Sequence, residues 1–226
     1  MKAVRVELVV MTVRDQALDV LLVRYPGNEW ALPGGSATPP RQVEAAAVEI
    51  LAEQTGVRDI SLEQLYTFDR DQGRGVSIDY LALIAADRHP LVPGAEVVEV
   101  RWFPLGDLPA MPDPHRCALG YAVTRLRAKT AYAPIAVQVL PETFTLGELQ
   151  SVYEAVLGTT LDTRNFRRDV LNAGIVEDVG RERRTSPGRP ARLYRSVPGE
   201  FAVVAEERRI AGRVRRSPEG GPPTDG

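Results

Sequence analysis

The stretch from Gly34 to Val57 constrains the fold of this chain more than any other segment does. Two glycines open it, an Ala- and Glu-rich segment follows, and Gly56 stands near its end. The apolar residues of the middle segment recur at intervals of three and four, which places them on one buried face of an α-helix. These residues are Val43, Ala46, Ala47, Ile50 and Leu51. Because Gly56 occupies the usual position of a helix C-cap, the stretch predicts a glycine turn followed by a half-buried helix.

Segments with the apolar, β-branched composition of strands lie on both sides of this helix. A short polar connection joins the first two, so we expect a hairpin there. A polar loop, Asp69–Gly75, separates two later strands. An N-cap residue followed by proline is a typical helix start, and it predicts a second long helix from Asp113-Pro114 to Lys129. The expected strands are Val4–Met11, Asp19–Arg24, Leu62–Phe68, Val76–Ala85 and Val97–Phe103.

The pattern changes after Ala131–Pro134, which we interpret as a domain boundary. Thr145 is followed three residues later by Glu148, and this spacing predicts a capping box at the start of a helix that ends near Gly158. A second helix and a hairpin are expected beyond it. They are Thr163–Asn172 with Asp162 as its N-cap, and Ile175–Val179 with Ala191–Tyr194, joined by a tip at Arg181–Arg189.

Two helices joined by a short turn and followed by a basic hairpin are typical of a winged helix-turn-helix. Nine arginines face four acidic residues between positions 164 and 195, although the whole chain carries a net charge of −2. The second helix of such a domain enters the major groove, while the wing contacts phosphates. A solvated, charged helical hairpin is the alternative interpretation. The predicted DNA-contacting residues are Thr145, Arg164, Asn165, Arg167, Arg168, Arg183, Arg184, Arg189 and Arg192.

Composition limits the other classes of protein. The chain is 44% hydrophobic and 26% charged, which is typical of a soluble globular protein. No apolar run reaches the length of a membrane span and the N-terminus lacks a signal-peptide pattern, so we expect a cytoplasmic protein without membrane contact. Cys117 is the only cysteine, and His89 and His115 are the only histidines. A disulfide within the chain is therefore excluded, and a zinc cluster has no ligands to use.

The Gly34–Val57 stretch resembles a Nudix box. With Gly35 and Gly56 as anchors, its spacing fits the family pattern without a gap. Glu49 stands where the family has an arginine. Only one of the four carboxylates of the pattern is retained, because their positions are occupied here by Arg41, Ile50, Glu53 and Gln54.

These departures weaken the prediction of catalysis. Nudix hydrolysis resembles other metal-assisted phosphoryl chemistry, in which clustered carboxylates hold divalent cations on phosphate oxygens. Here Ile50 joins the buried stripe, and only Glu49 and Glu53, on one helix face, remain for residual metal binding. We therefore expect no catalytic residue, no metal site and no required cofactor. Two alternatives stay open: an active Nudix hydrolase of nucleoside diphosphate derivatives with an appended regulatory domain, and an ordinary amphipathic helix without Nudix kinship.

A degraded Nudix domain followed by a winged helix resembles the Nudix-related transcriptional regulators of NAD metabolism. The residues that carry this resemblance are Trp30–Gly35, Gln64–Phe68, Phe144–Leu146, Asn165–Arg168 and Gly188–Tyr194. It implies an N-terminal domain of the α/β class over residues 1–133, folded as a Nudix-like α/β/α sandwich. It also implies a winged helix-turn-helix domain over residues 134–197. Residues 198–226 would form an extension, and its Gly, Pro and acidic composition predicts disorder from about residue 217.

The resemblance also implies a function. Such regulators are homodimers that repress by binding palindromic DNA operators. Many respond to ADP-ribose or a related nucleotide, whereas some relatives control sugar catabolism. Arginines and backbone N–H groups alone can hold a diphosphate. We therefore expect a repressor of NAD biosynthesis or salvage genes, in which the Pro114–Lys129 helix helps to form the dimer and transmits effector binding. The expected ligand-binding residues are Arg24, Gly34, Gly35, Glu53, Arg70 and Arg74.

Overall fold

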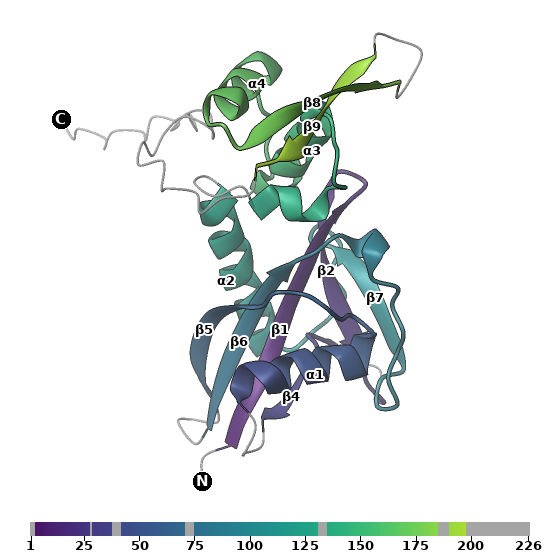
Figure 1. The fold of residues 1–226 in the computed structure, drawn as a ribbon. Helices are drawn as coiled ribbons and strands as arrows, with labels where there is room; N and C mark the ends of the chain where they lie inside the picture. Colours follow the sequence, from purple (N-terminus) through teal and green to yellow (C-terminus); the bar gives the residue numbers. More distant parts are fainter. Residues whose placement is uncertain are drawn as a thin grey trace, which may run out of the picture.

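The computed structural model describes residues 3–27, 29–37, 42–70, 75–130, 135–184 and 190–197. It contains an N-terminal domain built on a β-sheet and a C-terminal domain of helices and a hairpin (Figure 1). The N-terminal elements are β1 (Ala3–Arg14), β2 (Ala17–Arg24), β3 (Trp30–Ala31), β4 (Gly34–Ala37), α1 (Val43–Thr55), β5 (Glu63–Arg70), β6 (Gly75–Leu83), the 3₁₀ helix η2 (Ala86–Arg88), β7 (Glu99–Pro104) and α2 (Asp113–Thr130). The C-terminal elements are the 3₁₀ helix η3 (Ile135–Val139), α3 (Leu146–Leu157), α4 (Thr163–Asn172), β8 (Val176–Arg183) and β9 (Ala191–Ser196).

β1 is the central strand of the N-terminal sheet. It pairs with β2 and β4 in the antiparallel sense and with β6 in the parallel sense. The sheet runs in the order β3-β2-β1-β6-β5, and β7 pairs with β2. The predicted hairpin of the first two strands is confirmed. Its turn residues, Asp15 and Gln16, have φ of 46° and 62°, and positive φ at both positions is what a two-residue turn with matching twist requires.

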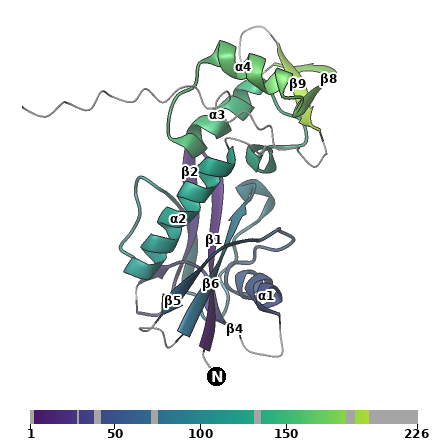
Figure 2. The same cartoon turned by 90° about the vertical axis from the view of Figure 1, so that its left-hand side faces the viewer.

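Helices cover both faces of this sheet, which confirms the α/β/α sandwich expected from the family resemblance. Side chains of β1 alternate between two apolar clusters because successive residues of a strand point to opposite faces. Leu8 packs in the cluster that contains Leu51 of α1. Val9 packs in the cluster that contains Leu119 of α2. Figure 2 shows α1 and α2 on opposite sides of the sheet.

The predicted character of α1 is confirmed. Ala46, Ala47 and Leu51 are buried, as the apolar stripe requires. Gly56 caps the C-terminal end with φ of 78°, and its N–H donates to the Ala52 carbonyl. The local periodicity and the capping glycine were therefore sufficient to place this helix.

Several strand predictions were wrong in their bounds. Gly34–Ala37 is a strand rather than a glycine turn, because β1 extends far enough to offer it an antiparallel partner. Asp69 and Arg70 belong to β5 rather than to a polar loop, because Arg70 pairs with Gly75 of β6. β6 ends at Leu83, two residues earlier than expected, and β7 begins and ends later than expected.

The C-terminal domain has the predicted winged-helix elements. The capping box of Thr145 and Glu148 is present at the start of α3. The Asp162 side chain accepts from the Asn165 N–H at 2.8 Å, so the predicted N-cap of α4 is confirmed. β8 runs through Arg183, so residues 181–183 are strand rather than hairpin tip. The remaining tip residues 185–189, the proposed boundary at 131–134 and the tail lie outside the described residues.

The two domains share one apolar core. Leu126 of α2 and Leu149 of α3 are buried in the same cluster as Val9 of β1. Phe144, which precedes α3, belongs to this cluster as well. None of the helices that the structure describes combines the length and the apolar character needed to cross a membrane.

Candidate functional site

The glycine segment, β4, lies directly against β1 and α1. Gly34 pairs with Glu7. A Cβ built on Gly34 would stand 2.1 Å from the Glu7 Oε2 and 2.5 Å from the Val6 carbonyl oxygen, so no side chain fits there. A Cβ on Gly35 would stand 3.3 Å from the Ile50 Cδ1. The backbone of this segment therefore lies between a buried carboxylate and the Nudix-type helix.

Gln54, which replaces a family carboxylate, fixes the glycine segment to α1. Its Nε2 donates to the Gly34 carbonyl oxygen at 2.9 Å, and its Oε1 accepts from the Gly34 N–H at 3.0 Å. The Tyr25 hydroxyl donates to the same Oε1 at 3.1 Å, and burial raises the pKa of this phenol. An ionised glutamate could not donate to the Gly34 carbonyl. Gln54 therefore has a structural role that a glutamate could not fill.

The remaining departures from the Nudix box affect metal binding. Glu49 and Glu53 are exposed on α1. Ile50 is partly buried against the cluster around Leu51. Among the residues that the structure describes, no three His, Cys, Asp or Glu side chains form a group that could hold a metal ion. Arg41 lies outside the described residues.

A charged cluster centred on a buried glutamate lies beside the glycine segment on the face that α2 covers. We call it the Glu7 cluster, and it comprises Arg5, Glu7, Arg70, Asp79 and His115. Glu7 is 4% exposed, and its Oε1 accepts from the Arg70 Nη1 at 2.7 Å and from the Arg5 Nε at 3.3 Å. Its Oε2 has no hydrogen-bond partner in the described part of the chain and lies 3.9 Å from the His115 Nδ1. Glu7 thus holds Arg70 beside the glycine segment.

Burial shifts the proton affinities within this cluster. It raises the pKa of Asp79 to about 6, and the Ser77 hydroxyl donates to the Asp79 Oδ1 at 2.5 Å. Burial lowers the pKa of His115. The His115 Nδ1 accepts from the Leu32 N–H at 3.0 Å, so this nitrogen carries no proton. His115 therefore ties the start of α2 to the chain that leads into the glycine segment.

The structure brings three of the predicted ligand-binding residues together. Gly34 and Gly35 form the start of the glycine segment, and Arg70 reaches the carboxylate against which Gly34 packs. The Arg70 side chain is 23% exposed. They place a guanidinium, a group that binds phosphate oxygens, beside the glycine backbone, although the Gly34 N–H itself donates to Gln54.

The other predicted ligand-binding residues lie apart from this group. Arg24 lies on β2, and two strands, β1 and β6, separate β2 from β5, which carries Arg70. Its Nη2 donates to a Glu99 carboxylate oxygen at 2.7 Å, and its guanidinium lies over the Trp30 ring. Glu53 is exposed on α1. Arg74 lies outside the described residues.

Sequence reasoning missed Glu7, Asp79 and His115 as members of the site. A signal was present, because Glu7 and Asp79 are acidic residues within otherwise apolar strands. A buried carboxylate requires partners, so such residues indicate a polar cluster. The identity of the partners depends on the sheet order, which local patterns do not contain.

α4 presents the basic face that the sequence predicts. Phe166 and Val170 are buried, and Phe166 packs edge-on against Tyr153 of α3. The opposite face carries the exposed residues Arg164, Asn165, Arg167 and Arg168. Within the described ranges, neither Arg164 nor Arg167 makes an ion pair or a side-chain hydrogen bond. Their guanidinium groups are therefore available to a partner outside the chain.

Other predicted DNA-contacting residues are engaged within the protein. Arg168 pairs with Asp169 at 2.9 Å, and Arg192 pairs with Asp178 at 3.1 Å. Both arginines keep more than half of their side chain exposed. Each arginine must break its ion pair, which costs free energy, before it can bind a phosphate.

The end of β8 that leads into the wing tip is bonded to α3. Arg183 pairs with Glu148 at 2.5 Å, and Glu148 also closes the capping box with Thr145. Thr145 is 8% exposed, so its hydroxyl is committed to this cap. Arg184 is exposed, and Arg189 lies outside the described residues.

A Nudix-fold sandwich joined to a winged helix with a basic second helix defines a Nudix-related DNA-binding protein. The NUDIX domain family matches residues 1–121, and the family described as NrtR DNA-binding winged helix domain matches residues 136–196. A protein of Acinetobacter baylyi named "ADPR responsive transcriptional repressor NtrR" is 32% identical over 203 residues, which are 84% of this chain and 80% of that protein. The chain belongs to the NrtR family.

Solved structures show the same arrangement of both domains. The crystal structure of Shewanella oneidensis NrtR complexed with a 27mer DNA is 35% identical, with a TM-score of 0.73 over 86% of this chain and 93% of that chain. The crystal structure of a MutT/nudix family protein from Enterococcus faecalis is 26% identical, with a TM-score of 0.71 over 87% of both chains. These likenesses cover the sheet and the winged helix together.

Proposed function

We propose that this protein is a transcriptional repressor whose N-terminal domain binds ADP-ribose or a related nucleotide and thereby controls DNA binding by its C-terminal domain. The observation that carries this proposal is the presence of Arg164 and Arg167, exposed and unpaired in the described ranges, on the second helix of a winged helix-turn-helix. That helix enters the major groove in such domains. The names of the Acinetobacter and Shewanella relatives support the same function.

A band-shift titration tests the proposal. The wild-type protein would first select duplexes from a random-sequence pool, and its affinity for them would then be measured with and without saturating ADP-ribose. We expect sequence-selective binding that ADP-ribose changes. A protein that selects no sequence, or one whose DNA affinity ignores ADP-ribose, would contradict the proposal.

We propose further that the N-terminal domain binds the nucleotide without hydrolysing it. Support comes from Ile50, which packs against Gly35, and from Gln54, which is bonded to Gly34. Both stand where hydrolysis uses carboxylates to hold metal ions. The alternative, an active hydrolase of nucleoside diphosphate derivatives, predicts cleavage of ADP-ribose when Mg²⁺ or Mn²⁺ is supplied. Turnover at about 1–10³ s⁻¹ would favour that alternative.

The proposed phosphate contacts are Arg70 and Arg74, with the backbone of Gly34 and Gly35 lining the site. Arg24 and Glu53 are weaker candidates because of their positions. Calorimetry with ADP-ribose on Arg70→Ala and Arg74→Ala should show losses of about 1.5–3 kcal/mol each, the contribution of a hydrogen bond to a charged group. Arg24→Ala serves as the matched control and should lose less. Unchanged affinity in both Arg70→Ala and Arg74→Ala would remove these two arginines from the site.

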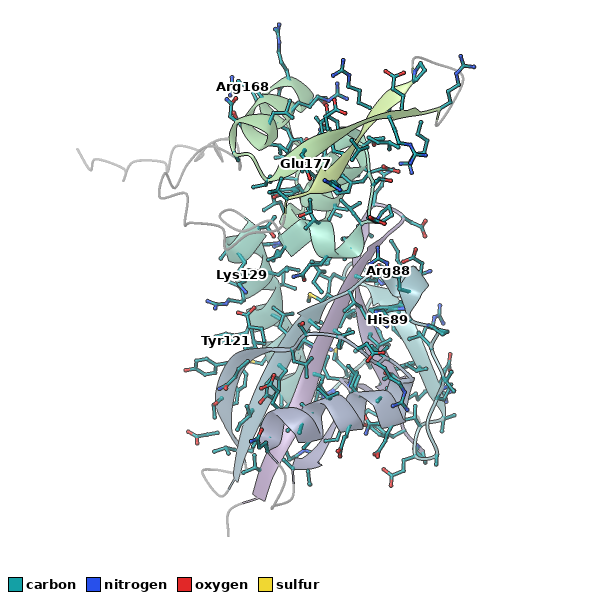
Figure 3. All side chains as sticks on the ribbon, viewed as in Figure 1. Arg88, His89, Tyr121, Lys129, Arg168 and Glu177 are labelled. Carbon is teal, nitrogen blue, oxygen red and sulfur yellow. The ribbon has the colours of Figure 1, made fainter. Side chains whose placement is uncertain are left out.

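We also propose that the protein acts in the cytoplasm as a homodimer on palindromic operators of NAD biosynthesis or salvage genes. One winged helix contacts only a few base pairs, so useful specificity requires two copies. Tyr121 of α2 and Tyr66 of β5 are 49% and 50% exposed and stack with their ring centroids 5.3 Å apart. Figure 3 shows Tyr121 projecting outward from α2. Exposed apolar patches often mark interaction surfaces, which supports α2 as part of the dimer face.

A further inference from the structure

α2 contacts both functional regions, one near each end. Near its start, His115 accepts a hydrogen bond from the Leu32 N–H at 3.0 Å and lies 3.9 Å from Glu7. Near its end, Arg127 reaches the C-terminal domain. The helix is continuous from Asp113 to Thr130, and at 1.5 Å per residue His115 and Arg127 lie about 18 Å apart along its axis. A single rigid element therefore connects the Glu7 cluster to the DNA-binding half.

Arg127 caps α3 from the other domain. Its Nε donates to the Val156 carbonyl oxygen at 3.0 Å. Val156 lies in the last turn of α3, where carbonyl groups have no partner within the helix. Gly158 ends α3 with φ of 69°, and a Cβ on it would stand 3.0 Å from the Arg127 Nη2. The guanidinium thus lies across this C-cap, where it satisfies an orphan carbonyl and places positive charge at the negative end of the helix dipole.

Directional polar contacts help to fix the angle between the domains. The apolar contacts around Leu126 and Leu149 hold the domains together, but hydrophobic burial has no preferred direction. One other polar contact crosses the junction in the described part of the chain: the Arg88 Nη2 donates to the Leu140 carbonyl oxygen at 2.9 Å. Figure 3 shows Arg88 at the end of the sheet that faces the C-terminal domain. Arg127 differs from Arg88 because its helix also contacts the Glu7 cluster.

A change in the angle of α3 would reach the DNA-binding face of α4. Tyr153 of α3 packs against Phe166 of α4 with ring centroids 5.3 Å apart. The Gln150 Nε2 donates to the Leu161 carbonyl oxygen at 3.0 Å and to the Thr163 Oγ1 at 3.2 Å. These contacts make α3 and α4 one unit, so the arginines of α4 follow α3.

We propose that Arg127 is the positioning residue that passes the effector signal to the DNA-binding surface. A diphosphate that takes Arg70 from Glu7, or that moves the backbone at Leu32, changes the contacts of His115. α2 carries this change to the C-cap of α3, and Arg127 converts it into a new angle of α4. The inference rests on the proposed function, because it assigns one residue to the coupling between effector binding and DNA binding. Such coupling requires that the effector bind more tightly to one of two domain arrangements than to the other.

The test compares DNA affinity of the full chain with and without saturating ADP-ribose, on a duplex that the wild-type protein selects from a random pool. The ratio of the two affinities is the coupling factor. Arg127→Leu should retain less than about a third of that factor, while its affinity for ADP-ribose without DNA stays within about twofold of wild type. Arg127→Lys, which keeps a donor for Val156, should retain most of it. Arg125→Leu is the matched control, because Arg125 pairs with Glu63 at 3.0 Å inside the N-terminal domain.

Gly158→Asn disturbs the same contact from the other domain. Asn tolerates positive φ, but its Cβ would push the Arg127 guanidinium aside, so we expect the same loss of coupling. If circular dichroism shows that Arg127→Leu is unfolded, the coupling factors of Gly158→Asn and Arg127→Lys test the inference instead. A wild-type protein whose DNA affinity ignores ADP-ribose would overturn the proposed function, and this inference with it. Full coupling in Arg127→Leu and Gly158→Asn, or an equal loss in Arg125→Leu, would overturn this inference alone.

Discussion

The side chains that stand in place of the Nudix carboxylates make specific contacts in this protein. Gln54 uses both ends of its amide on the backbone of Gly34. Ile50 fills the space beside Gly35. A reversion to the family's residues would therefore disturb the glycine segment before it could restore any chemistry. Single positions of the box cannot be exchanged independently of the backbone that they hold.

Gln54→Glu should destabilise the protein. An ionised glutamate cannot donate to the Gly34 carbonyl, and it would repel that oxygen instead, at a cost of about 1–3 kcal/mol. Urea denaturation of the variant and of the wild type measures the difference in the free energy of unfolding. The control is Glu53→Gln on the same helix, where an exposed side chain changes stability by about 0.5 kcal/mol or less. Equal stability of Gln54→Glu and wild type would show that the bonds to Gly34 contribute nothing.

Asp79 should make stability depend on pH. Burial raises its pKa from 3.8 to about 6, so the folded state retains a proton that the unfolded state releases. Stability present at low pH is therefore lost as the pH rises from about 4 through about 6. Asp79→Asn cannot ionise and should exceed wild type by about 3 kcal/mol near pH 8, with little difference near pH 4. Urea denaturation at both pH values checks this, with the exposed Asp87→Asn as control; a pH-independent difference would contradict it.

The starts of α3 and α4 were predicted to the residue, whereas the strand bounds and the Glu7 cluster were not. The signals for α3 and α4 are local, because Thr145, Glu148 and Asp162 act within one turn of the helix. β4 is a strand because it pairs with β1, which is distant in the sequence. A local sequence pattern contains no information about that pairing. The Glu7 cluster escaped prediction for the same reason. Its members come from β1, β5, β6 and α2, and only the sheet order places them together.

The two basic elements of the C-terminal domain should differ in their effect on sequence selectivity. Arg164→Ala and Arg167→Ala should each lose about 1–3 kcal/mol on the selected duplex and less on a random one, if these side chains contact base edges. Arg184→Ala or Arg189→Ala in the wing should weaken binding to both duplexes alike. Band-shift titrations on both duplexes separate the two patterns. Helix variants that bind the selected duplex as tightly as wild type would refute the assignment of α4.

If the protein binds DNA as the proposed dimer, two copies of α4 must lie on one face of the DNA. Their centres would lie one helical turn apart, roughly 34 Å, or a multiple of that distance. In that dimer, the domain angle at the Arg127 contact and the proposed dimer face at α2 would together determine this spacing. Effector and DNA must then affect each other by the same factor, because coupling between two binding sites is reciprocal.

Sedimentation of the protein alone should show a dimer at micromolar concentration. Tyr121→Glu places a charge on the exposed aromatic surface and should shift the protein toward monomer, with a loss of cooperative binding to a palindromic duplex. Val48→Glu on α1 is the matched control, because Val48 is a 38% exposed apolar residue on the opposite side of the sheet. A wild-type monomer that binds a palindrome without cooperativity would rule out the dimer.

The shared core also limits how this protein can be taken apart. Leu126, Leu149 and Phe144 are buried together with side chains of the sheet, so cutting between the domains would expose apolar surface on both pieces. An isolated winged helix would be prone to aggregation, and a winged helix grafted onto a foreign sensor would have no α2 to rest on. Any engineered switch built from this family must therefore transplant α2 and the winged helix as a single part.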